Sequence, residues 1–292
     1  MSTGARTVGV VSPGAMGSAV GAALVRGGAR VVATLAGRSE RTSRLAERAG
    51  IELMPDLESV VREADVVLSI APPEAARAIA ADIRGTARAA AAQPLVADLN
   101  AVAPASARAI ADELLHEGLD LVDGSISGPP PWKHSTTRVY LSGARAHEIA
   151  DLPIDGVERI AVGDEVGTAS AVKMSTASVY KGTSALLAQA LLAARANGVL
   201  EHVLDDLRAG SPEVVANVER RLASAAAKSG RYVGEMREIA ATQAAAGLTP
   251  ALFESFAEIY ATVATSELAR SAPDEIPVEL DLEEVLERLR VR

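Results

Sequence analysis

The chain has no cysteine and few aromatic residues, and both absences restrict its chemistry. Without cysteine it can form neither a disulfide nor a thiolate metal site, and it has no thiol nucleophile. Two Phe, four Tyr and one Trp make up 2% of the 292 residues, whereas alanine alone contributes 59. The apolar mass therefore lies in small side chains, which favours close-packed helices over an aromatic-rich β-sandwich.

Positive charge is also scarce. The chain has 29 basic and 38 acidic residues, a net charge of −9 and no basic run, which argues against a nucleic-acid partner. Residues 7–25 carry no charge, but Pro13 and four glycines interrupt this stretch, so we expect neither an export signal nor a membrane span. The four histidines show no metal-ligand spacing, and we expect no metal. The composition predicts a cytoplasmic protein.

Short apolar runs and helical patterns alternate along the first part of the chain. The predicted strands are 8–11, 31–35, 64–71, 95–99, 119–123 and 138–142, and the predicted helices are 15–27, 41–49, 74–84 and 104–118. Nearly continuous apolar strands separated by helices indicate a doubly wound parallel sheet with both faces covered. The sequence therefore predicts a Rossmann-type α/β fold over residues 1–164.

After about Gly163 the alternation stops and no strand pattern follows Gly167. Ala-rich helical stretches replace it, and the first runs from Thr168 to Ala196, which would span roughly 43 Å. We predict that residues 165–292 form an all-helical domain for substrate binding and dimerisation. Its long first helix is expected to bridge the two domains or to line a dimer interface.

The turn after the first predicted strand reads Ser12-Pro13-Gly14-Ala15-Met16-Gly17. It matches G-x-G-x-x-G with serine in the first place, and it lies where the first strand passes into the first helix. Gly14 would let the backbone approach a pyrophosphate, and Gly17 would allow close packing of helix on strand. The helix N-terminus attracts the anion. These six residues are therefore predicted to bind a dinucleotide.

The end of the second predicted strand lacks the acidic residue that usually binds the ribose 2′-hydroxyl of NAD. It carries Arg38 and Ser39 instead. Because a guanidinium suits phosphate oxygens, both residues could contact a 2′-phosphate. We therefore expect NADP(H) in preference to NAD(H).

Lys173 stands out because the chain has only four lysines against 25 arginines. Lysine can lose its proton when desolvated, whereas arginine cannot. Lys173 lies in the helix that opens the second domain, and Thr176 and Tyr180 fall on the same helical face. We predict that Lys173 is a catalytic acid and base, with Thr176 and Tyr180 near the substrate.

A loop rich in small residues follows the strand near residue 120. Ser127 and Gly128 can offer hydroxyl and backbone donors to a substrate anion, and the proline run after them stiffens the loop. Trp132 closes this segment and is predicted to contact the substrate.

Together these segments resemble the β-hydroxyacid dehydrogenase and 6-phosphogluconate dehydrogenase superfamily. The opening Gly-x-Met-Gly matches residues 14–17, and the family's Asp-Val-Val strand ending before proline matches residues 65–73. Residues 98–104 resemble its D-x-S-T-x-x-P loop beside the nicotinamide. The resemblance implies that Ala71, Pro72 and Asn100 contact the cofactor.

The second set of motifs concerns the substrate. Residues 123–128 resemble the family's D-x-x-x-S-G-G motif, and residues 163–173 resemble the segment that supplies its catalytic lysine. Met236-Arg237-Glu238 resembles a later Lys-Asp pair. The resemblance implies that Asn100, Ser127 and Arg237 orient the substrate, and that two chains form a homodimer through their helical halves.

The chain departs from the family pattern in three segments. Ser12 replaces the first glycine of the turn, Thr176 and Ala177 stand where the family has an asparagine after its lysine, and Pro129 replaces a glycine. Proline has no N–H to donate, so a substrate carboxylate would need another partner, such as Asn100 or Arg237.

The sequence thus predicts an NAD(P)-dependent oxidoreductase. It would transfer a hydride between the nicotinamide and a small hydroxy acid or related carbonyl, with Lys173 moving the proton. An imine reductase is the first alternative, although Lys173 weighs against it because those enzymes generally carry another residue there. A protein that binds NADP(H) without turnover is the second.

Overall fold

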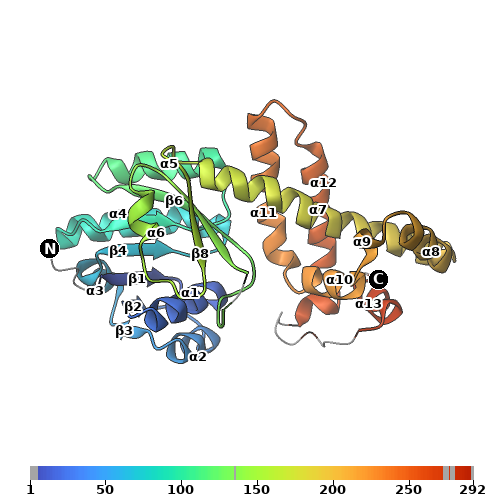
Figure 1. The fold of residues 1–292 in the computed structure, drawn as a ribbon, viewed down its shortest axis with the longest axis horizontal. Helices are drawn as coiled ribbons and strands as arrows, with labels where there is room; N and C mark the ends of the chain where they lie inside the picture. The colour runs from blue at the N-terminus through green and yellow to red at the C-terminus, as the bar shows by residue number, and fades with distance from the viewer. Residues whose placement is uncertain (1–5, 135, 272–275, 277–279, 291–292) are drawn as a thin grey trace. The chain divides into compact units, whose positions relative to one another are not determined.

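The first part of the chain folds around one eight-stranded sheet in this computed structural model (Figure 1). The structure describes residues 6–134, 136–271, 276 and 280–290. The strand order is β3-β2-β1-β4-β5-β6-β7-β8. The strands are β1 (Thr7–Val11), β2 (Arg30–Thr34), β3 (Glu52–Met54), β4 (Val66–Ser69), β5 (Leu95–Asp98), β6 (Leu121–Ser127), β7 (Arg138–Ser142) and β8 (Glu158–Gly163). The order reverses at β1, where a doubly wound fold binds its ligand.

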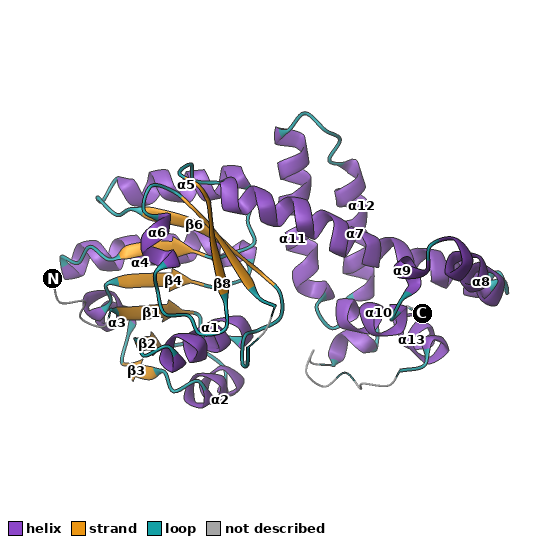
Figure 2. Cartoon of the chain, in the orientation of Figure 1, coloured by secondary structure: helices purple, strands orange, loops and turns teal. Residues whose placement is uncertain are grey.

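Helices cover both faces of this sheet (Figure 2). They are α1 (Ala15–Arg26), α2 (Glu40–Arg48), α3 (Leu57–Glu63), α4 (Pro73–Ala90), α5 (Pro104–Leu115) and α6 (Ala146–Ala150). One apolar core lies between the sheet and the helices α1 and α6, and another lies between the sheet and α3, α4 and α5. Val66 and Leu68 face the first core and Val67 the second, because alternate residues of a strand point to opposite faces. The Rossmann-type prediction is confirmed.

Four features of this part of the chain differ from the sequence prediction. Strand β3 and helix α3 were not predicted, and β8 was missed because none of its side chains is buried. β7 pairs antiparallel with β6, so the sheet is not wholly parallel. The physical reason is that no helix lies between β6 and β7, and a parallel pair needs a crossover connection.

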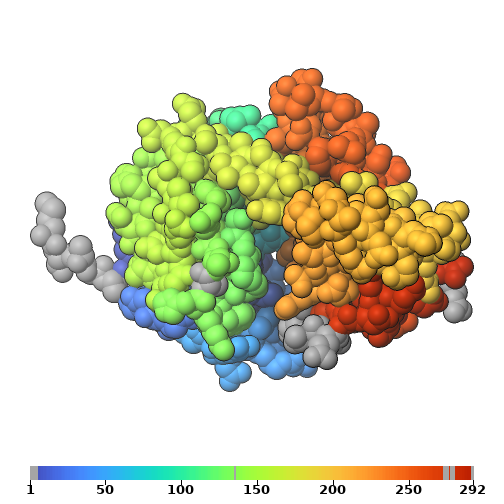
Figure 3. Space-filling view, turned by 45° about the vertical axis from the view of Figure 1, so that its right-hand side comes forward, coloured from blue at the N-terminus to red at the C-terminus, as the bar shows by residue number. Residues whose placement is uncertain are grey.

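The rest of the described chain consists of helices joined by turns and loops. Its helices are α7 (Thr168–Ala196), α8 (Leu200–Gly210), α9 (Pro212–Val215), α10 (Val218–Ala226), α11 (Ser229–Ala245), α12 (Ala251–Val263), the 3₁₀ turn η1 (Leu268–Arg270) and α13 (Leu282–Leu289). Helix α7 has the bounds that the sequence predicts. Leu191, Leu222 and Leu286 lie in one apolar core of this part. Figure 3 shows the segments from α8 to α10 (gold to orange) beside α13 (red) on its surface.

The chain divides into two compact units, residues 1–174 and 175–292. The division falls within α7, after the predicted boundary at residue 164. Lys173 therefore belongs to the same unit as the sheet. Among the described residues, no helix is both long enough and apolar enough to cross a membrane.

Candidate active site

The turn between β1 and α1 has the backbone of a dinucleotide-binding turn. Ser12 adopts a left-handed conformation with φ of +65°, which is uncommon for a residue with a side chain and easy for glycine. Serine thus adopts here the left-handed conformation that a glycine would adopt easily. The N–H of Gly14 donates to the carbonyl of Ser12 at 2.7 Å and closes the turn.

Gly14 and Gly17 serve different purposes in this turn. A Cβ at Gly17 would lie 2.5 Å from the carbonyl oxygen of Ser12, so the close approach of α1 to the turn requires glycine. A Cβ at Gly14 would meet nothing within 4 Å. Helix α1 also has no side-chain cap and no acidic residue in its first turn. Open space and uncapped N–H groups fit a pyrophosphate at this helix end.

This difference predicts that alanine variants of Gly14 and Gly17 differ in their melting temperatures. Gly14→Ala is expected to keep the melting temperature of the free protein, because its φ of −72° suits alanine and the site is open. It should weaken binding of NADPH, because the methyl group would fill the space of the pyrophosphate. Gly17→Ala, by contrast, should lower the melting temperature, because its methyl group would clash with the carbonyl of Ser12. Fluorescence titration measures the NADPH affinity, and thermal unfolding measures the melting temperature. An unchanged NADPH affinity in Gly14→Ala would contradict the prediction that this turn binds the pyrophosphate.

Arg38 and Ser39 follow β2 at the same edge of the sheet. Both are exposed, and the guanidinium of Arg38 forms no ion pair within the described residues. The Oγ of Ser39 accepts the N–H of Thr42 at 3.4 Å and caps α2. Arg38 is therefore available to an anion, whereas Ser39 already has a structural task.

Asn100 connects the ends of β4 and β5. Its Oδ1 accepts the N–H of Ala71 at 2.5 Å, and its Nδ2 donates to the Oγ of Ser69 at 2.9 Å. Pro72 follows Ala71 as the N-cap of α4. Because Asn100 is only 2% exposed, these bonds hold two neighbouring loops in place. Direct contact of Asn100, Ala71 or Pro72 with a ligand stays a prediction.

Asp98 is a buried carboxyl group that the sequence analysis did not single out as a site residue. Its Oδ1 accepts the N–H of Asn100 at 2.9 Å, whereas no described group bonds its Oδ2. Burial raises the pKa of Asp98 to about 7, and the charge of Asp123 on the next strand adds to the rise, while the bond from Asn100 opposes it. Asp98 is the first residue of the segment 98–104 that resembles the family's D-x-S-T-x-x-P loop. Nothing in the neighbouring sequence indicates that its carboxyl group is buried.

Lys173 lies beside the predicted substrate loop. Its Nζ donates to the carbonyl of Ile126 at 2.6 Å, directly before Ser127 and Gly128. Gly128 has a φ of +124°, and a Cβ there would come within 2.8 Å of the Cα of Thr137. The structure thus brings together Lys173, Ser127 and Gly128, which the sequence placed in one site.

Trp132 contacts two arginines, and its predicted contact with the substrate stays a prediction. The guanidinium of Arg48 lies over its ring at 4.5 Å, and Nη1 of Arg26 donates to its carbonyl at 3.3 Å. Arg26 and Arg48 end α1 and α2, so these contacts lie at the opposite end of α1 from the glycine turn. The proline run carries the ring onto the core of the first unit.

The other predicted substrate residues belong to the helical unit. Thr176 and Tyr180 follow Lys173 on α7, and Tyr180 is 70% exposed. Arg237 lies exposed on α11. Their role at the substrate stays a prediction. Across the residues that the structure describes, no group of three His, Asp or Glu side chains could hold a metal ion.

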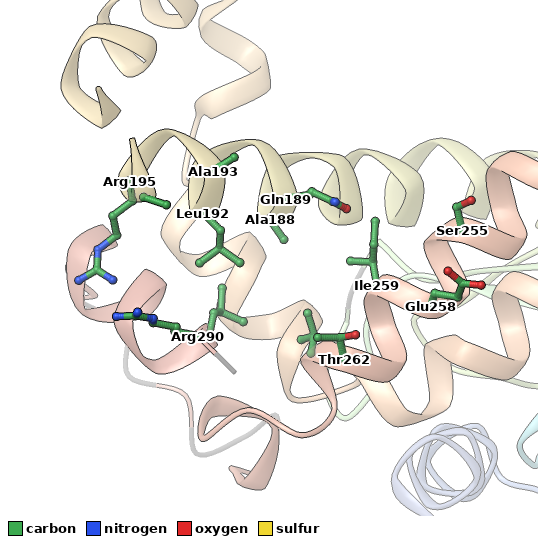
Figure 4. A pocket seen from close by; sticks show the side chains of 13 residues that line it. Ala188, Gln189, Leu192, Ala193, Arg195, Ser255, Glu258, Ile259, Thr262 and Arg290 are labelled. Carbon is green, nitrogen blue, oxygen red and sulfur yellow. The ribbon is translucent and has the colours of Figure 1, made fainter. Parts of the chain in front are cut away.

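The helical unit contains a cavity of about 1050 Å³ between α7, α12 and α13 (Figure 4). Gln189, Leu192, Ser255, Ile259 and Arg290 are among its lining residues. None of the predicted site residues lines it, so it plays no part in the site described above.

Comparison with known proteins decides the family. Residues 7–152 match the NAD-binding domain of 6-phosphogluconate dehydrogenase. The chain belongs to this family. Its residues 194–263 match a further family, a domain of unknown function named DUF1932. A dinucleotide-binding domain is therefore present, as the glycine turn predicts.

An uncharacterized 28.5 kDa protein of Methanothermus fervidus is 27% identical over 175 residues. The match covers 59% of this chain and 64% of that protein, so the chain spans somewhat under two thirds of its relative.

Solved structures resemble the whole chain. A conserved protein of unknown function, described as structurally similar to 3-hydroxyacid dehydrogenases, is 28% identical with a TM-score of 0.66, covering 88% of this chain and 96% of that one. The 3-hydroxyisobutyrate dehydrogenase of Mycobacterium tuberculosis, solved with L-serine, is 22% identical with a TM-score of 0.70, covering 98% and 99%. An imine reductase of Myxococcus stipitatus is 19% identical with a TM-score of 0.55, covering 88% and 92%. The last two show the shared fold.

Proposed function

We propose that this protein is an NADP(H)-dependent oxidoreductase acting on a small hydroxy acid or the corresponding carbonyl compound. The observation that carries the proposal is the position of Lys173, whose amine lies at the carbonyl of Ile126 beside Ser127 and Gly128. The NAD-binding family of the first unit and the likeness of a relative to 3-hydroxyacid dehydrogenases support it.

The residues of the β1–α1 turn would hold the pyrophosphate, and the loops joined by Asn100 would lie beside the nicotinamide. When bound, the nicotinamide supplies the carbon that takes or gives a hydride. In oxidation the neutral amine of Lys173 takes the proton of the substrate hydroxyl as its carbon loses the hydride. In reduction the ammonium returns that proton to the carbonyl oxygen. Ser127 and the N–H of Gly128 would orient the substrate carboxylate.

Lys181, the next lysine of α7, suits this task less well. Its amine pairs with the carboxylate of Glu235, and these two side chains are only 13% and 5% exposed. A buried carboxylate partner favours the charged amine and opposes its release of a proton. The amine of Lys173 donates to a neutral carbonyl, that of Ile126.

A substrate screen tests the proposal. Purified protein would be assayed with NADP⁺ and NAD⁺ against a panel of 3-hydroxy acids, and with NADPH and NADH against cyclic imines, following nicotinamide absorbance. Turnover of hydroxy acids supports the proposal, and turnover of cyclic imines alone would favour the imine reductase. Binding of NADPH without turnover in either panel would favour a non-catalytic protein.

The preference for NADP(H) rests on Arg38, which is exposed after β2 without an ion-pair partner among the described residues. A charge-assisted bond from Arg38 to the 2′-phosphate is worth about 1.5–3 kcal/mol, so Arg38→Ala should raise the Kd of NADPH by roughly 10–100-fold. The Kd of NADH should not change. Arg44→Ala, which removes an exposed arginine paired with Glu40, is the matched control. Equal Kd values for both cofactors in the unaltered protein would contradict the preference.

We also propose a homodimer through the helical unit. Val179, Tyr180, Leu186 and Leu252 expose more than half of their surface, which is unusual for apolar side chains grouped on two helices. Sedimentation equilibrium measures the state, and a monomer at micromolar concentration would reject the proposal.

A further inference from the structure

We propose that Asp123 is a positioning residue, which fixes the N-terminal turn of α7 on strand β6 and so holds the amine of Lys173 at the substrate loop. The inference rests on the proposed function for its catalytic consequence only. The geometry on which it stands involves residues 123–173, all in the first unit.

The carboxylate of Asp123 accepts four hydrogen bonds. Its Oδ2 accepts the N–H of Gly167 at 2.9 Å, the N–H of Ser170 at 3.0 Å and the Oγ–H of Ser142 at 2.9 Å. Its Oδ1 accepts the Oγ–H of Ser170 at 2.6 Å. Asp123 is only 1% exposed, so water does not replace these bonds.

Together these bonds supply what the first turn of α7 needs. The first N–H groups of a helix have no partner within it, and a negative charge at that end also interacts favourably with the helix dipole. The remaining donors are satisfied nearby, because Ser142 Oγ accepts the N–H of Ala169 at 3.0 Å and Glu165 accepts that of Thr168. Asp123 thus caps α7 from strand β6, which is distant from it in the sequence.

The contacts continue along β6 toward Lys173. Ser125 lies on the same strand face as Asp123 and donates to the carbonyl of Ala169 at 2.9 Å. One residue later on β6, the carbonyl of Ile126 accepts the amine of Lys173. Helix α7 therefore bonds to β6 at Asp123, Ser125 and Ile126. Of these three, only Asp123 bonds through a carboxylate.

This arrangement gives Asp123, the first residue of the segment 123–128, a structural role. The resemblance assigns that segment to the substrate, but every acceptor site that the structure shows on Asp123 faces α7 or Ser142. Asp123 would act on the reaction through Lys173. A shift of Lys173 by about 1 Å would lower turnover by roughly 10²-fold, because proton transfer requires a short, aligned approach.

The small number of lysines permits a direct test. Protein labelled with ¹³C at lysine Cε should give four signals, assigned by replacing each lysine with arginine in turn. In Asp123→Asn the charge is lost, and the NH₂ cannot accept the bonds of the oxygen that it replaces, so the first turn of α7 should shift. We expect the Lys173 signal and its titration midpoint to move while the Lys133, Lys181 and Lys228 signals stay. The kcat should fall by about 10–100-fold with KM and the Kd of NADPH little changed.

Asp56→Asn is the matched control. Asp56 caps α3 by accepting the N–H of Ser59 at 2.8 Å, so the same substitution there removes the charge of a helix cap without touching α7. It should leave the Lys173 signal and kcat as they are. Where Asp123→Asn fails to fold, Ser170→Ala removes one of the four bonds and should move the Lys173 signal less.

Two outcomes judge the proposals separately. A Lys173 signal that coincides with that of the unaltered protein in Asp123→Asn and Ser170→Ala overturns the positioning role, whatever the activity. A moved Lys173 signal together with full turnover in Lys173→Ala supports the positioning role and rejects the proposed chemistry.

Discussion

Lys173→Ala is expected to lower kcat for the hydroxy acid by about 10²–10⁴-fold, the usual contribution of a positioned acid or base. The amine would be lost from its place at the carbonyl of Ile126, and no other lysine of the described chain donates there. The Kd of NADPH should not change, because the proposed pyrophosphate contacts lie in residues 12–17. Steady-state kinetics and fluorescence titration measure the two quantities.

Lys173→Arg sharpens this result. Arginine keeps the positive charge and can still donate to a carbonyl, but it does not give up its proton at ordinary pH. Oxidation of the alcohol should therefore fall about as far in Lys173→Arg as in the alanine variant. Had Lys173 served only to bind a substrate carboxylate, arginine would restore turnover. Lys133→Ala, at an exposed lysine of the first unit, is the control.

The pH dependence gives a second check on the same residue. With an amine as base, alcohol oxidation should rise with pH, and carbonyl reduction should fall over the same range, because the two directions use opposite protonation states. Both dependences should disappear in Lys173→Ala. Retained turnover with an unchanged pH profile would exclude Lys173 from proton transfer.

Local patterns predicted the parts of the fold whose evidence lies within a few residues. The turn from Ser12 to Gly17 is set by its own glycines, and α7 is bounded by glycines before Thr168 and after Ala196. Strand β3 has only three residues with no buried side chain, so no apolar run marked it. The antiparallel direction of β7 depends on its pairing with β6, which sequence periodicity does not record.

In the site, too, local patterns predicted some residues, whereas the roles of others depend on distant neighbours. Lys173 was found because lysine is rare in this chain, and Ser127 and Gly128 were found because small residues followed a strand. The contacts of Trp132 with Arg48 and Arg26 were not predicted, since they depend on how its loop turns onto the ends of α1 and α2. The tasks of Asp98 and Asp123 depend on burial and on neighbours far away in the sequence, such as Ser142 on β7 beside Asp123, neither of which composition reveals.

The buried carboxyl of Asp98 should make stability depend on pH. Burial raises its pKa from an ordinary value of 3.8 to about 7, so between these values the folded chain holds a proton that the unfolded chain has released. Stability attributable to this group therefore falls as pH rises from about 4 to about 7, and the full penalty applies above that range. A shift of this size corresponds to about 4 kcal/mol.

Asp98→Asn should remove this dependence. Its Oδ1 can still accept the N–H of Asn100, and its uncharged amide has no proton to lose, although an unpartnered buried NH₂ costs about 1–3 kcal/mol at every pH. Relative to the unaltered protein, the free energy of unfolding of the variant should therefore improve by about 2–3 kcal/mol between pH 5 and pH 8. Urea unfolding at the two pH values measures this difference. Asp112→Asn, at an exposed aspartate on α5, should show no such change, and a constant gap for Asp98→Asn would mean that Asp98 is ionised at both pH values.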